Sequence, residues 1–383
     1  MQARLCLRPP LPKPNPASPA PVPQSIRRVE QEVQAVRGLR YLHPVAVAPV
    51  TQAQLVRGID QSFDHSYPAG LYGRRGRVWQ VIGVIPKDVD LRDALHQFLS
   101  TQVVGYYDPT TGQLVFVGTS TPSALQRLAL AHELTHADDD QHFDLNRVNG
   151  IENRCQDERQ MAALGAIEGS AQFFMFRVGQ RFFSIGDSIS VLFQGSSPPP
   201  GVPPFLQDIL LWPYLDGVRF VASLDARGGL AEVNGAIRNL PLSTEQVIHP
   251  DRYPSDAPTV VEVPDLGPRL GTGWRDLDVM DVGEAWLDAM ISPSATPVAT
   301  TPKGDPAAGW DGGQYRAWSR GSHVAVVLQT VWDSRDAARS FAAQAARWMG
   351  GRRDAEAGVS GENVTLLFAS DRATFSLLKR AIR

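Results

Sequence analysis

Residues 131–145 read AHELTHADDDQHFDL, and they place His132, Glu133 and His136 in a His-Glu-x-x-His pattern. Positions four apart on an α-helix lie about 40° apart around its axis, so both imidazoles can reach one metal ion. Glu133 lies about 100° from His132 around the axis and borders the same face without being forced onto the metal. The pattern therefore predicts a helix that carries half of a zinc site and a carboxylate beside it.

The helix with this motif is predicted to begin near Thr121 as N-cap, with Pro122 at the first helical position. Its apolar stripe contains Leu125 and Leu128 and continues through the two histidines, which are therefore expected to face the interior. Two core histidines satisfied by protein partners are the alternative to a metal site.

A second helix is predicted over residues 151–180, and Glu168 falls in its apolar stripe. A buried carboxylate is costly unless a cation or hydrogen-bond donors compensate it, and a zinc ion supplies that cation. We therefore expect one zinc ion per chain, bound by His132, His136 and Glu168. Small residues in this helix would allow a close approach to the first one: Ala163, Gly165, Gly169, Ser170 and Ala171.

His-Glu-x-x-His on one helix and Glu-Gly-x-Ala on a later helix resemble the pattern of the gluzincin zinc metallopeptidases. More narrowly, the segments AHELTHADDDQHFDL, ALGAIEGSAQ, WPYLDGVRFV, STEQVIHPDRY and AAGWDGGQY look like a poorly characterised group of bacterial and archaeal proteins identified as zinc peptidases. The resemblance covers roughly residues 100–345. It implies a zincin-like fold and hydrolysis of peptide bonds by a metal-activated water molecule, with Glu133 as general base, but it implies no particular substrate.

One position departs from the gluzincin pattern. Four residues after Glu168, where thermolysin-like enzymes carry an aspartate that supports a zinc histidine, this chain has Gln172. Asp140, four residues after His136, is the best placed replacement, because such partners fix the orientation of a ligand histidine. Asp138 and Asp139 are expected to be solvated.

Hydrolysis also needs a donor for the oxyanion that develops on the carbonyl. The segment STEQVIHPDRYP offers His249 first and Tyr253 second, and a structural loop with exposed polar residues is the alternative.

The segment VVGYYDPTTGQLVFVG before the zinc helix predicts a hairpin, because a Pro-containing turn and a Gly separate two β-rich runs. Either Val103–Tyr107 or Leu114–Val117 is expected to be an edge strand that binds substrate backbone.

The predicted fold class is α+β. Four segments are expected: a Pro-rich disordered tail over 1–24, a zincin-like catalytic domain over 25–291, a linker or long loop over 292–309, and a small α+β accessory unit over 310–383. Within the catalytic domain, residues 77–86 are expected to form a strand and 90–102 a helix. A helix over 205–224 is expected to be interrupted at Pro213.

A formal charge of −3 over 383 residues argues against nucleic acid as a partner. No apolar run reaches the roughly 18–20 residues that span a bilayer. Cys6 and Cys155, one in the expected tail and one in an expected helix, suggest no disulfide framework. A Pro-rich spacer often follows an export signal, so an extracytoplasmic location is expected if such a signal lies upstream, and a cytoplasmic one stays open.

The leading function is a zinc-dependent peptidase that acts on a peptide or protein. The alternatives are a zincin-fold metal-binding module without peptidase activity and a hydrolase of a non-peptide amide. The complete set of Glu133, both histidines and Glu168 argues against the binding module, because a module of that kind needs no base. No feature of the sequence indicates an oligomeric state.

Overall fold

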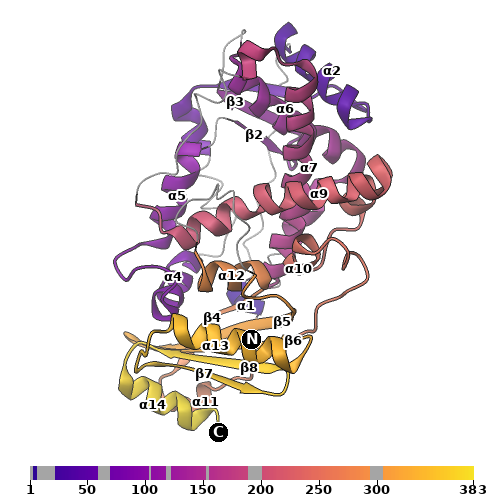
Figure 1. Cartoon of the computed structure of the whole chain (residues 1–383). Coiled ribbons are helices and arrows are strands. Elements are labelled where there is room, and N and C mark those ends of the chain that lie inside the picture. The colour runs from indigo at the N-terminus through magenta and orange to yellow at the C-terminus, as the bar shows by residue number, and fades with distance from the viewer. Residues whose placement is uncertain are drawn as a thin grey trace.

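The chain forms a helical part and a five-stranded sheet, which lie at opposite ends of the molecule in Figure 1. This mixed architecture confirms the predicted α+β class. Most of the predicted Pro-rich tail, the middle of the predicted linker and Thr121 lie outside the described residues. The computed structural model describes residues 3–6, 22–58, 70–102, 105–117, 122–151, 155–188, 201–293 and 305–383.

A small three-stranded sheet packs against the helix that carries the motif. Its order is β1-β3-β2, with β1 parallel and β2 antiparallel to β3, so β2 and β3 form the predicted hairpin. Because β3 lies in the middle, β2 is the edge strand on the hairpin side. The elements are β1 (Ala46–Val50), β2 (Gly105–Asp108), β3 (Gln113–Val117), the motif helix α6 (Ala124–Phe143) and α2 (Gln24–Arg37), which packs on α6.

Helix α7 (Asp157–Phe182) packs against α6 on one side and against α9 (Pro204–Arg238) on the other. The contact with α9 is very close, since a Cβ atom added at Gly169 would overlap the backbone of Gly217. The prediction of an interruption at Pro213 is wrong, because the helix continues through it. The break comes at Gly229, whose φ of 64° suits a residue without a side chain.

The five-stranded sheet has the order β4-β5-β6-β8-β7, and every neighbouring pair is antiparallel. One face packs against α13 and the helical part, and the other face is covered by α11 and α14. The elements are β4 (Arg275–Asp281), β5 (Trp310–Arg320), β6 (His323–Trp332), β7 (Ala355–Ser360), β8 (Asn363–Ala369), α11 (Gly267–Leu270), α13 (Arg335–Trp348) and α14 (Arg372–Ala381).

The sheet and the helical part share one hydrophobic core. The predicted accessory unit over 310–383 therefore lacks one strand of its own sheet. Strand β4, which precedes the predicted linker, supplies one edge of the sheet. Aromatic rings connect the parts: Trp286 of α12 (Glu284–Ile291) contacts Phe205 of α9 at 5.5 Å and Tyr315 of β5 at 6.4 Å between ring centroids. Residues 310–383 contain both strands and helices, as the predicted α+β unit requires.

Residues 77–86 do not form the predicted strand. They belong mainly to helix α4 (Leu71–Ile82), which ends at Gly83 in the left-handed conformation. Val78 and Ile82, four residues apart, are both fully buried, which is helical spacing. The β-branched residues that suggested a strand instead fill the core beside α5 (Leu91–Gln102), a helix that confirms the prediction for 90–102.

Two predictions about the cysteines are wrong. Cys6, at the end of α1 (Ala3–Cys6), forms a disulfide with Cys155, and their Cα atoms are 5.3 Å apart. Cys155 lies just before α7 rather than inside a helix, because the chain first forms a short 3-10 helix, η1 (Leu145–Gly150). Residue 6 is therefore fixed to the body of the protein and is not part of a free tail.

Among the described residues, no helix is both long enough and apolar enough to cross a membrane.

Candidate metal centre

Helix α6 presents both histidines of the motif to the interior. Ser123 is its N-cap and forms a capping box with Gln126, so the predicted N-cap at Thr121 is wrong. His132 and His136 are each 8% exposed, which confirms that they face inward, and their Nε2 atoms lie 3.1 Å apart. Leu125 and Leu128 share the histidine face by helical spacing but are only half-buried. The fully buried Leu130 and Leu134 lie on the opposite side of α6, in the core with α2 and β3.

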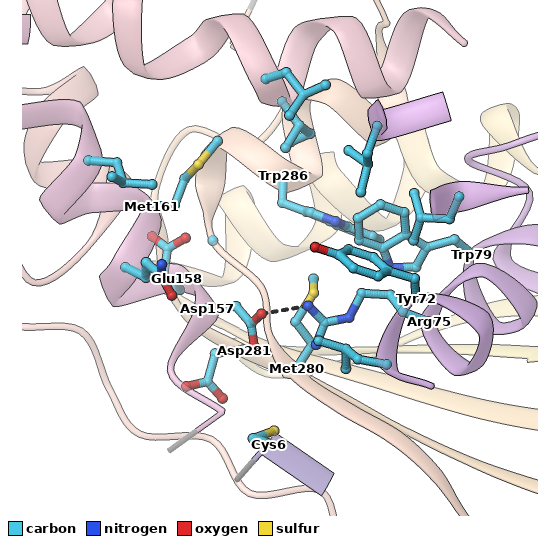
Figure 2. Close-up of a pocket in the computed structure, with 18 of the residues that line it drawn as sticks. Cys6, Tyr72, Arg75, Trp79, Asp157, Glu158, Met161, Met280, Asp281 and Trp286 are labelled. Carbon is cyan, nitrogen blue, oxygen red and sulfur yellow. Dashed lines mark hydrogen bonds and ion pairs between the residues drawn. The ribbon is translucent and has the colours of Figure 1, made fainter. Parts of the chain in front are cut away.

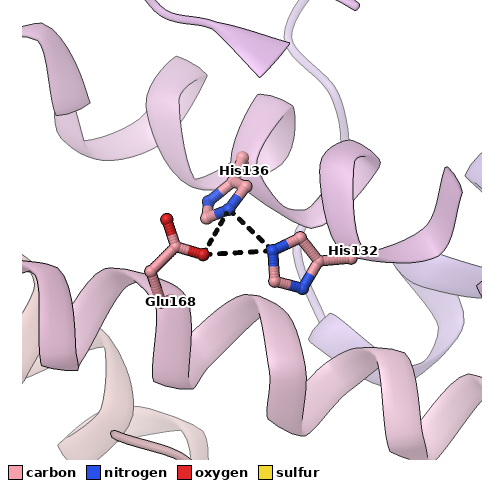
Figure 3. Close-up of side chains that lie close together, drawn as sticks. All are labelled: His132, His136 and Glu168. Atoms are coloured by element: carbon pink, nitrogen blue, oxygen red, sulfur yellow. Dashed lines mark hydrogen bonds and ion pairs between the residues drawn. The ribbon is translucent and has the colours of Figure 1, made fainter. Parts of the chain in front are cut away.

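Glu168 reaches the histidines from α7 (Figure 3). Its Oε2 lies 3.1 Å from His132 Nε2 and 3.3 Å from His136 Nε2. In a tetrahedral zinc site, ligand distances of about 2.0–2.1 Å place neighbouring ligand atoms about 3.3–3.4 Å apart. The three predicted ligands therefore form a group with the spacing that a metal ion requires.

The charges of these side chains depend strongly on one another. Burial by itself lowers the pKa of His136, but the Glu168 carboxylate outweighs burial and raises this pKa to about 9. Burial would raise the pKa of Glu168, yet the two histidines hold it well below its usual range. Near neutral pH the two groups form an imidazolium–carboxylate pair, and a divalent cation at the same atoms would replace the proton.

Glu133 lies beside the ligands and is held by strand β2. The backbone N–H of Tyr107 donates to Glu133 Oε2 at 2.8 Å, and burial raises the pKa of this carboxyl group. Because the Tyr107 N–H bonds to Glu133, it points away from β3, and residues two apart share this direction. The backbone groups of Gly105 are therefore expected to face the same side. Of the two predicted edge strands, the structure selects the one that contains Tyr107.

Asp140 does not support a metal ligand, and this prediction is wrong. Its Oδ2 accepts a hydrogen bond from the Tyr107 hydroxyl at 2.8 Å, and its Oδ1 accepts one from Leu145 N at 2.8 Å. The carboxylate lies in the last turn of α6, where these two donors are close at hand. Through its hydrogen bond with Tyr107, Asp140 instead connects the C-terminal end of α6 to β2.

Asp138 and Asp139 are buried, contrary to the prediction that they are solvated. Asp139 accepts hydrogen bonds from Arg37 Nε of α2 and from Ser170 Oγ of α7, both at 2.7 Å. Arg37 is fully buried, so this is an interior ion pair that joins three helices behind the histidines. Asp139 is also among the groups that raise the pKa of His136.

Tyr214 of α9 is a site residue that sequence reasoning missed. Its ring stacks on His132 at 5.9 Å between centroids. Its hydroxyl interacts with Glu168, whose negative charge is the main reason that the pKa of Tyr214 lies well above its ordinary value. The signal was available in the segment WPYLDGVRFV, where Tyr214 carries a polar group in an otherwise apolar stretch.

We expect Tyr214→Phe to weaken metal binding about 10- to 100-fold, as loss of a partner of a metal ligand commonly does. The variant removes only the hydroxyl that orients Glu168. Competition with a chromophoric chelator measures the dissociation constant. Tyr253→Phe is the matched control and should bind metal like the wild type. Equal affinities for Tyr214→Phe and the wild type would rule out this role.

The structure does not bring His249 or Tyr253 to the metal ligands, so the predicted oxyanion donors are wrong. His249 Nε2 lies 2.9 Å from Glu284 Oε1 of α12, in a separate group of side chains. The Tyr253 hydroxyl donates to the Asn239 carbonyl at 2.6 Å, and its ring packs on Phe220. His249 follows directly after the short helix α10 (Thr244–Ile248), which packs on α12 and orients the loop toward it.

An apolar pocket of about 270 Å³ lies along α7 and α9 (Figure 2). Leu164 lines it and precedes Glu168 by one helical turn, a rise of about 6 Å. Leu210 also lines it and precedes Tyr214 by one turn. Helices α7 and α9 therefore contribute Glu168 and Tyr214 to the metal group and, one turn earlier, part of the pocket wall. Further apolar lining comes from α4, α5 and α12, including Trp79, Leu95 and Trp286.

Comparison with known proteins identifies one related region. Residues 274–377, which contain all five strands of the sheet with α12, α13 and the first part of α14, match a family model described as a domain of unknown function (DUF8575). Neither the curated proteins nor the solved structures contain a significant match to the chain.

Proposed function

We propose that this protein is a zinc-dependent peptidase with a zincin-like catalytic region. The observation that carries the proposal is the position of Glu133, a half-buried carboxylate fixed by an edge strand next to His132, His136 and Glu168. A zinc ion, when bound, lowers the pKa of a water molecule and polarises a carbonyl group. The donor set of two imidazoles and one carboxylate is typical of catalytic zinc.

The residues of the chain supply the proton transfers. Glu133 takes the proton of the attacking water molecule and passes it to the leaving amine. Burial raises the pKa of Glu133, which brings it closer to the working pH and makes it a better base and acid. Tyr107 holds this carboxylate in place through its backbone N–H, so the base does not have to be ordered during the reaction.

The surroundings suggest how a polypeptide would bind. The edge strand β2 offers the outward backbone groups of Gly105 and the carbonyl of Tyr107, which can pair with an extended chain, while the Tyr107 N–H stays bonded to Glu133. The pocket lined by Leu164 and Leu210 would then accept an apolar side chain next to the cleaved bond. We therefore expect a preference for substrates with a large apolar residue near the cleavage site.

A proteome-derived peptide library tests the function. We expect the zinc-loaded protein to cleave it with enrichment of large apolar residues on one side of the bond. Treatment with a chelator should stop cleavage, and added zinc should restore it. A protein that binds zinc but leaves the library and full-length proteins intact would instead support the metal-binding module. Cleavage confined to small acyl amides would support a hydrolase of non-peptide amides.

The disulfide between Cys6 and Cys155 supports an extracytoplasmic location, because such bonds persist in oxidising compartments. Fractionation of the source cells tests this location, and recovery of the protein only from the cytosol would contradict it.

A further inference from the structure

A second group of potential ligands lies away from His132, His136 and Glu168. His249 Nε2 is 2.9 Å from Glu284 Oε1 and 3.4 Å from Asp305 Oδ2. The three ligand atoms all lie within 4.8 Å of one another. They come from the residue after α10, the first turn of α12 and the segment that leads into β5, so they join three separate parts of the chain.

The Glu284 carboxylate is fully buried, yet only one of its two oxygens has a hydrogen-bond partner among the described residues. Its Oε1 is paired with His249, whereas Oε2 has no hydrogen-bond partner among the described residues. Burial and the neighbouring Asp305 and Asp288 raise the pKa of Glu284 to about 9, even though His249 acts in the opposite direction. A buried carboxylate oxygen without a partner is unfavourable, and a cation would satisfy it.

The acidic side chains of this group outnumber the basic ones beside them. The Asp305 carboxylate contacts both Glu284 and Asp288, so three carboxylates share one imidazole. The nearby Arg252 is engaged elsewhere, by ion pairs with Glu245, Asp256 and Asp333. The group therefore brings three carboxyl groups together beside a single imidazole in a partly buried position.

We propose that His249, Glu284 and Asp305 bind a second divalent metal ion of the zinc type, distinct from the one at His132, His136 and Glu168. The imidazole nitrogen favours zinc over calcium or magnesium, which prefer oxygen ligands alone. The spacings of 2.9 and 3.4 Å from His249 Nε2 are close to the roughly 3.3 Å between ligands of a tetrahedral zinc ion. The role of this ion is structural, because its ligands connect α10, α12 and the segment that leads into β5.

The test counts metal ions in the full-length protein. Each variant is stripped with a chelator, equilibrated with zinc chloride, passed over a desalting column and analysed by mass spectrometry of the elements. We expect two zinc ions in the wild type and one in His132→Ala/His136→Ala. Adding Glu284→Gln to this double variant should leave none, and adding Asp305→Asn should do the same. Asp256→Asn is the matched control and should retain the single ion.

The outcomes separate the two metal proposals. A folded His132→Ala/His136→Ala protein without zinc overturns the second site and leaves these residues as a hydrogen-bonded cluster. A single zinc that survives in both Glu284→Gln and Asp305→Asn of the double variant also overturns it. A wild type with one zinc, which persists in the double variant and is lost with Glu284→Gln, supports the second site and removes the first.

Discussion

Replacing Glu133 with glutamine is expected to lower the turnover of a cleaved peptide by about 10²–10⁴, or roughly 3–5 kcal/mol of transition-state stabilisation. The amide has nearly the shape of the carboxylate but cannot accept a proton from water. Since Glu133 is not one of the three ligands, zinc content should be unchanged. Steady-state kinetics at saturating zinc, together with metal analysis, measure both quantities.

Asp144→Asn is the matched control, because it makes the same chemical change at an exposed position just after α6. This variant should keep wild-type turnover. The proposed role of Glu133 fails if Glu133→Gln cleaves the peptide at the wild-type rate, or if its inactivity comes from loss of zinc.

Replacing Arg37 with methionine is expected to reduce the free energy of unfolding by about 3–5 kcal/mol, because it leaves Asp139 as a buried carboxylate without its cation. The guanidinium also lies 4.7 Å over the ring of Phe174, and this contact is lost as well. Urea denaturation followed by circular dichroism measures the change. A loss below about 1 kcal/mol would show that the pair contributes little.

Two further variants identify the cause of the Arg37 effect. Arg28→Met removes a guanidinium that is 71% exposed and paired with Glu32 one turn away, so its effect should stay below about 1 kcal/mol. Arg37→Met/Asp139→Asn removes both charges of the buried pair and should recover part of the lost stability. A double variant as unstable as Arg37→Met would mean that packing, and not the unpaired charge, explains the loss.

The metal ligands could be predicted because local rules fix them. The spacing within one helix places His132 and His136 on the same side, whatever the rest of the fold does. Glu168 was recognisable as a carboxylate in an apolar stripe, which needs a charged partner. The hairpin could also be predicted from local sequence, because its turn residues lie between two β-rich runs.

The errors concern contacts between distant segments. Arg37 and Asp139 are 102 positions apart, and Cys6 and Cys155 are 149 apart, so no local pattern could pair them. Asp138 and Asp139 were predicted to be solvated because Arg37, the buried cation that pairs with Asp139, lies on another helix. His249 was chosen for its residue type and its Pro-containing loop, but the packing of α10 against α12 decides where that loop points.

The metal site is tested by an anomalous difference map from crystals of the zinc-loaded protein, collected at the zinc absorption edge. We predict a strong peak within about 2.0–2.2 Å of His132 Nε2, His136 Nε2 and a Glu168 carboxylate oxygen. A map without a peak there, in which Glu168 is hydrogen-bonded directly to the two histidines, would contradict a zinc ion at these residues.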